Sequence, residues 1–185
     1  PQLFRPSDVG KYKVDVVAKT IRELNPDVEL TVLPRAFQFD DVISDNDPDQ
    51  DFGENESPPI MDRRLAVFSC VDGMAARADL WKMSRQYAEF WGDTRMSGET
   101  GRFLTSVGRK QVDEPDTYTG TLYSDDDPEL TRGSCTSRSL NCTAMILAGV
   151  IVHQFTLFLR GFPTVEDKMF NIKTSEIFDS AEVPV

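Results

Sequence analysis

A short apolar run that ends in an aspartate and leads straight into a helical pattern constrains the fold of this chain most. Residues 64–72, RLAVFSCVD, are nearly continuously apolar, which is typical of a strand buried on both faces of a parallel sheet. Residues 73–92 then repeat aromatic and aliphatic residues at helical spacing and predict a helix. Alternating strands and helices predict an α/β sheet with crossover helices.

Further segments continue this alternation. A helix over residues 9–27 is predicted from the helical spacing of its aliphatic residues, and Asn25-Pro26 is its stop signal. The other predicted elements are strands over residues 28–34, 101–108 and 167–178 and a buried helix over residues 139–161. With 185 residues and 39% hydrophobic content, we expect one domain over residues 1–185.

Residues 40–62 interrupt this pattern. They are rich in Asp, Glu and Pro, and they contain almost nothing that a core could bury. We therefore expect a mobile acidic surface insertion.

Charge and cysteine content exclude several classes of function. The formal net charge of -11 argues against a nucleic-acid surface, because phosphate binding needs a basic face. The longest apolar run, residues 144–152, is shorter than a bilayer span, so we expect no membrane segment. Three cysteines without a CxxC pair argue against a structural zinc site and suit the reducing cytoplasm.

The sequence GSCTSRSLNCTAMILAGV, residues 133–150, raises the possibility of a reactive thiol. Cys135 directly precedes the predicted helix and lies near two arginines, a setting that favours thiolate. The alternative is that Cys135 simply fills a loop. Cys142 is expected to pack within the helix, and Cys70 to be a small buried hydrophobe in its strand.

Other polar residues give weaker signals. The lone His153 is expected in the core of its helix, so no Ser-His-Asp or Cys-His pairing supports a hydrolase. Asp93 and Arg95 form either an ion pair near a functional site or a surface pair.

Three segments, in this order, resemble the adenylyltransferase domain of ThiF and the ubiquitin-activating (E1) enzymes. They are LFRPSDVGKYKVDVVAKTIRELNPDV, VFSCVDGMAARADLW and SCTSRS. The resemblance runs from Gln2 to about Gly161, apart from the acidic insertion. It implies a Rossmann-like domain with a mainly parallel sheet and flanking helices. It also implies ATP-dependent adenylylation of the C-terminal carboxylate of a ubiquitin-like or sulfur-carrier protein, often followed by thioester transfer to a cysteine.

The resemblance assigns roles to four residues. Lys13 and Gln2 would contact ATP, Asp72 would hold magnesium beside it, and Cys135 would accept the acyl group. Two plainer readings stay open: Lys13 as an exposed surface lysine, and Asp72 as a helix N-cap, a role compatible with metal binding.

The chain also departs from the family pattern. It contains no GxGxxG loop, Pro1 stands where an arginine is expected before Gln2, and Gly73 replaces the usual asparagine after Asp72. These departures predict an N-terminally incomplete domain whose nucleotide site needs residues outside this chain. We expect a homodimer, or a heterodimer with an E1-like subunit. The alternative function is a noncatalytic E1-like subunit that serves as a protein-binding scaffold.

Overall fold

The computed structural model describes residues 4–38, 64–111, 114–124 and 141–179. The chain divides into two compact units, Pro1–Ile60 and Met61–Val185, which are considered separately below. Gln2, Cys135 and the predicted insertion at residues 40–62 lie outside the described residues. The expectation of one domain over residues 1–185 stays a prediction.

The first unit contains a 3-10 helix η1 (Pro6–Asp8) and the helix α1 (Lys13–Leu24). The predicted stop is confirmed, because the amide of Asn25 closes α1 by donating to the carbonyl of Ile21 at 2.8 Å. The strand predicted over residues 28–34 is wrong, since this segment has no strand structure. Its alternating pattern finds no hydrogen-bonded partner among the described strands, and a strand needs one.

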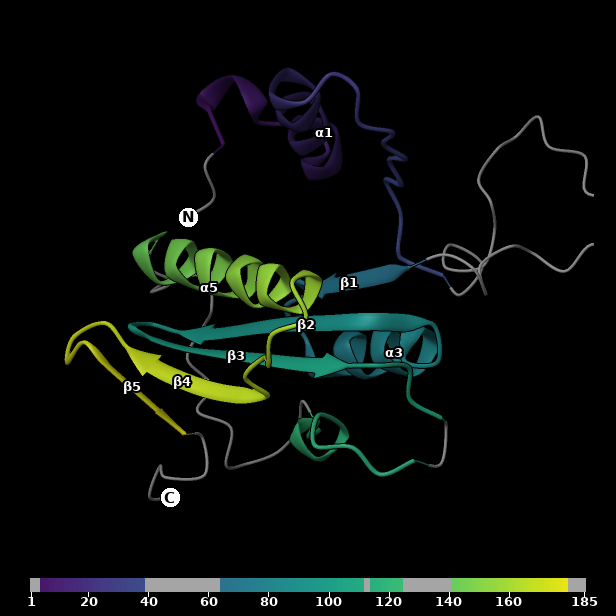
Figure 1. Ribbon diagram of the computed structural model, residues 1–185. Helices are drawn as coiled ribbons and strands as arrows, with labels where there is room; N and C mark the ends of the chain where they lie inside the picture. The colour runs from purple at the N-terminus through teal and green to yellow at the C-terminus, as the bar shows by residue number, and fades with distance from the viewer. Residues whose placement is uncertain (1–3, 39–63, 112–113, 125–140, 180–185) are drawn as a thin grey trace, which may run out of the picture. The chain divides into compact units, whose positions relative to one another are not determined.

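The second unit is built on a five-stranded sheet in the order β1-β2-β3-β4-β5 (Figure 1). The strands are β1 (Leu65–Ser69), β2 (Ala88–Ser97), β3 (Thr100–Val107), β4 (Asp167–Asn171) and β5 (Glu176–Asp179). The helix α3 (Met74–Ser84) connects β1 to β2, which run parallel. The α/β fold class is thus confirmed.

Parallel pairing in this sheet is limited to β1 and β2, and the other three pairs are antiparallel. The expected mainly parallel sheet is therefore a mixed one. The reason lies in the connections: only Gly98 and Glu99 separate β2 from β3, which is enough for a hairpin and far too short for a crossover.

Two element predictions need further correction. The helix predicted over residues 73–92 stops at Ser84, and β2 begins at Ala88. Phe90 and Trp91 are both almost fully buried, but in the strand they lie on opposite faces, where period 2 replaces helical spacing. Residues 167–178 form the hairpin of β4 and β5 instead of a single strand. The expectation that β1 is buried on both faces is also wrong, because β1 is the outermost strand of the sheet and is only partly buried.

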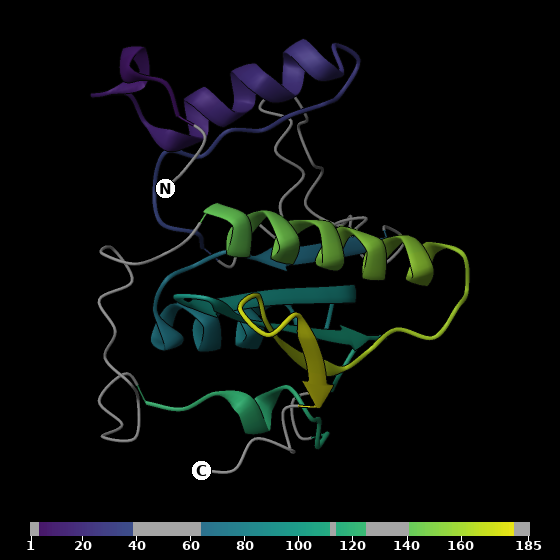
Figure 2. The ribbon, with the colours of Figure 1, turned by 90° about the vertical axis from the view of Figure 1, so that its left-hand side faces the viewer.

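Helices cover both faces of this sheet. The helix α5 (Asn141–Leu159) lies over one face and α3 over the other (Figures 1 and 2). Two buried clusters fill the layers: Trp81, Trp91, Leu104 and Tyr118 in one, and Phe103, Leu147, Ile151 and Phe170 in the other. The second unit is consequently a three-layer α/β/α arrangement.

Much of the surface of α5 is apolar and exposed. Leu147 and Ile151 are buried against the sheet, whereas Met145 and Val152 are 61% and 56% exposed. By length and composition alone, α5 could cross a membrane, and 22% of its apolar window is buried. The apolar run of residues 144–152 is shorter than a bilayer span, but α5 is longer than this run because the helix continues past His153 and Gln154 to Leu159. The absence of a membrane segment stays a prediction.

Candidate functional site

Asp72 occupies the turn between the end of β1 and the start of α3. Its side chain is exposed and makes no hydrogen bond or ion pair with the described residues. Gly73, and not Asp72, is the N-cap residue of α3, and a glycine has no side chain that could cap this helix end. The capping role considered for Asp72 is therefore wrong, which leaves its carboxylate open to solvent.

A buried ionic network lies beneath this turn. Asp93 on β2 is fully buried, and its two carboxylate oxygens accept hydrogen bonds from Arg77 Nε at 2.9 Å and Arg95 Nε at 2.7 Å. The phenol of Tyr118 donates a third bond to the same carboxylate at 3.1 Å. In the parallel register, Ser69 lies beside Asp93, so the network is at the carboxyl end of β1.

The remaining donors of the two arginines bind backbone and hydroxyl oxygens. Arg77 Nη2 donates to the carbonyl of Thr94 at 3.0 Å. Arg95 donates to the carbonyl and the hydroxyl of Thr121, both at 2.9 Å. The surface alternative for Asp93 and Arg95 is thus wrong, because the pair is buried on β2. Arg77 joins it from α3 and fastens this helix to the sheet close to Asp72.

Arg77 and Tyr118 are the two members of this network that the sequence analysis did not identify, and Tyr118 gave the weaker signal. It comes from the polar connection after β3, where no periodicity marks it as a core residue. Burial raises the pKa of its phenol well above the usual value, and the negative charge of Asp93 adds to this effect. The phenol therefore stays protonated and donates to Asp93 at neutral pH.

The two described cysteines are not where the sequence placed them. Cys70 follows β1 and is exposed instead of buried, because the strand ends at Ser69. The surrounding protein still desolvates the thiol in part, and this desolvation raises the pKa of Cys70. The negative charge of Asp93 adds to the rise, and the positive charge of Arg77 opposes it. Cys142 was expected to pack within the helix, but it is exposed in the first described turn of α5.

Two further predicted positions fall on the surface. His153 is exposed on α5, so the expectation of a core histidine is wrong. Lys13 is the first residue of α1 in the first unit, is exposed, and makes no ion pair with a described residue. Within the described ranges, no three His, Cys, Asp or Glu side chains gather as a metal site would require.

The ThiF family matches residues 1–184 of the chain. The chain belongs to the ThiF family. The match includes the acidic insertion and every candidate residue, so the family resemblance of the three quoted segments is confirmed.

Two curated relatives of this ThiF-family chain share a name. The chain is 26% identical over 185 residues to ubiquitin-like modifier-activating enzyme 5 of Xenopus laevis and 25% identical over 174 residues to that of Gallus gallus. In each case the alignment covers 88% of this chain and 41% of the relative. The chain thus spans less than half the length of these curated relatives.

Proposed function

We propose that this chain takes part in the ATP-dependent activation of a ubiquitin-like or sulfur-carrier protein. In the proposed reaction, a carboxylate oxygen at the carrier's C-terminus attacks the α-phosphorus of ATP, and the bond to the bridging oxygen breaks as pyrophosphate leaves. The observation that carries the proposal is Asp72, whose carboxylate has no partner among the described residues and lies three residues past the carboxyl end of β1. Open α/β sheets bind ligands at this edge.

Asp72 is suited to holding magnesium. Mg²⁺ is commonly bound by one or two carboxylates together with substrate phosphates. The exposed Asp72 carboxylate has no partner in the part of the chain that the structure describes, so it is available for that role. When bound, the ion would offset the negative charge that gathers on the phosphates. The Arg77–Asp93 ion pair supports this role, because it fixes the first turns of α3 directly after Asp72.

In the same proposal, Lys13 and Gln2 contact ATP, and Cys135 receives the activated acyl group. The Cys135 thiolate would attack the carbonyl carbon of the acyl adenylate, forming a thioester as AMP leaves. The chain would act as a homodimer or with an E1-like subunit. The noncatalytic scaffold is the second candidate, favoured by the large exposed apolar surface of α5.

Substituting Asp72 tests the nucleotide role without an identified carrier. Asp72→Asn should abolish the gain in ATP affinity that magnesium provides, because the amide removes the charge and keeps the shape. Asp79→Asn is the matched control, since Asp79 is also an exposed aspartate but lies within α3, outside the turn that follows β1. Calorimetric titration of ATP with magnesium or with EDTA gives the readout. If Asp72→Asn retains the magnesium effect, Asp72 is not the ligand.

Substituting Cys135 tests the acyl step separately. Incubating the chain with ATP, magnesium and a panel of ubiquitin-like and sulfur-carrier proteins should give an adduct that dithiothreitol cleaves. Cys135→Ala should abolish this adduct and spare pyrophosphate exchange, whereas Cys142→Ala should preserve both. Exchange without any adduct would limit the activity to adenylylation. The absence of both reactions with every carrier, in this chain and in a form extended upstream by a glycine-rich loop, would favour the scaffold.

A further inference from the structure

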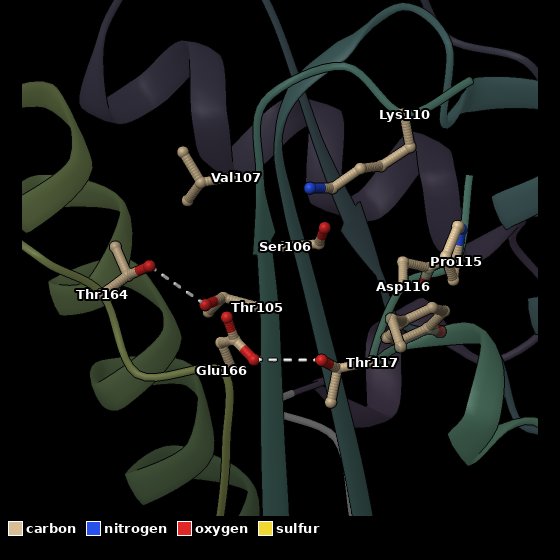
Figure 3. A pocket seen from close by; sticks show the side chains of 10 residues that line it. Thr105, Ser106, Val107, Lys110, Pro115, Asp116, Thr117, Thr164 and Glu166 are labelled. Atoms are coloured by element: carbon tan, nitrogen blue, oxygen red, sulfur yellow. Dashed lines mark hydrogen bonds between the residues drawn. The ribbon is translucent and has the colours of Figure 1, made fainter.

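A polar cavity of about 460 Å³ opens at the carboxyl end of β3 (Figure 3). Its walls come from β3, from the segment that follows this strand, and from the turn that precedes β4. Small-molecule sites in proteins commonly have volumes of about 300–1,000 Å³. The cavity is therefore large enough for a small metabolite.

This cavity is distinct from the Asp72 site. β3 runs antiparallel to β2, and Val107 at its end pairs with Phe90 near the start of β2. Asp72 follows the opposite end of the parallel β1–β2 pair, where Ser69 lies beside Asp93. The two sites thus lie at opposite ends of the strands of one sheet.

Two opposite charges line this cavity without neutralising each other. The Lys110 ammonium group points into it, toward the Ser106 hydroxyl, and has no hydrogen bond or ion pair with any described residue (Figure 3). The Glu166 carboxylate accepts a bond from the Thr117 hydroxyl at 3.1 Å and pairs with no described cation. Both charges are available to a ligand.

The third charged residue of the lining differs from these two. Asp116 pairs with Arg85 at 3.0 Å and accepts two bonds, each of 2.6 Å, from the amide and hydroxyl of Thr119. Its charge is already neutralised within the protein. The charge offered to a ligand is consequently one ammonium and one carboxylate.

The backbones that carry the two free charges are held in place. The amide of Lys110 donates to the carbonyl of Arg85 at 2.8 Å, and the carbonyl of Glu166 accepts from the amide of Thr105 at 2.9 Å. Anchored groups lose less conformational entropy when they bind a ligand.

We propose that this cavity binds a free α-amino acid. The ligand's carboxylate would lie at Lys110 and Ser106, and its ammonium group at Glu166. A purely anionic ligand would meet Glu166 and a purely cationic one would meet Lys110, so a zwitterion alone complements both groups. Pro115 and the ring of Tyr118 supply apolar contacts for the amino-acid side chain.

Calorimetry on the intact chain tests this proposal with the twenty standard amino acids as probes. At least one should bind with a dissociation constant below about 1 mM. Its methyl ester, which lacks the carboxylate, and its N-acetyl derivative, which lacks the ammonium group, should each bind at least tenfold more weakly.

Two variants assign the charges to their residues. Lys110→Met should weaken the amino acid at least tenfold and leave binding of the methyl ester unchanged. Glu166→Gln, which keeps an acceptor for Thr117, should weaken the amino acid and leave the N-acetyl derivative unchanged. Lys173→Met, at an exposed lysine outside the cavity, is the control and should bind like the unmodified chain.

Neither variant breaks an ion pair between described residues, so both should retain the thermal midpoint of the unmodified chain. No saturable binding of any amino acid up to 10 mM by the folded protein would overturn the proposal. Equal affinity for the amino acid, its ester and its N-acetyl derivative would overturn it as well.

Discussion

Asp93 connects three segments that are far apart in the sequence. Its carboxylate receives Arg77 from α3, Arg95 from its own strand and Tyr118 from the connection after β3. A fully buried carboxylate is costly to desolvate, and here two guanidinium groups and a phenol offset that cost. The pairing therefore has to be complete to be tolerated.

Asp93→Asn should lower the free energy of unfolding by about 3–5 kcal/mol, because it leaves two buried arginines without a counter-charge. The control is Glu23→Gln, which breaks the exposed pair with Lys19 at 3.8 Å and should cost less than about 1 kcal/mol. Urea denaturation at pH 7 measures both variants. Similar losses in the two variants would show that the network adds no stability of its own.

At the scale of elements, the contact between α5 and the sheet depends on a glycine. A Cβ atom added at Gly101 on β3 would lie 2.5 Å from the ring of Phe170 and 3.2 Å from Leu147 of α5. Gly149, on α5 itself, is exposed and has nothing within 4 Å of an added Cβ. The same substitution should hence have opposite effects at the two positions.

Gly101→Ala should destabilise the fold by about 1–3 kcal/mol, since the packed ring of Phe170 must move. Gly149→Ala should stabilise it by about 0.5–1 kcal/mol, because alanine restricts the unfolded chain and favours the helix. Thermal denaturation of both variants provides the measurement. Destabilisation by Gly149→Ala would mean that the outer face of α5 is covered in solution.

At the scale of the whole molecule, charge is distributed unevenly along the chain. Residues 40–62 contain nine acidic residues and no lysine or arginine, so they carry most of the net charge of -11. Self-repulsion of this kind destabilises a compact state and is screened by salt.

Replacing residues 40–62 with a short Gly/Ser linker should leave the chain folded, with a thermal midpoint within about 10 °C of the original. It should also reduce the rise in this midpoint between 20 and 300 mM NaCl, because less repulsion remains to be screened. Scanning calorimetry at the two salt concentrations measures both effects. A larger fall in the midpoint would show that the acidic segment packs against the rest of the chain.

The sequence by itself determined the features that local chemistry encodes. Asn25-Pro26 ends α1 because proline restricts the residue before it. The apolar run before Asp72 forms β1, and the segment after Gly73 forms α3. These ordered motifs were also enough to indicate the ThiF family.

Only the tertiary structure decided how these pieces combine. The aromatic residues Phe90 and Trp91 fit helical spacing as well as strand alternation, and β2 forms because β1 and β3 supply hydrogen-bonding partners on both sides. The burial of Asp93 and the recruitment of Tyr118 depend on contacts across 16 to 25 residues. No local pattern encodes such contacts, because their energy arises only when the chain brings the charges together away from water.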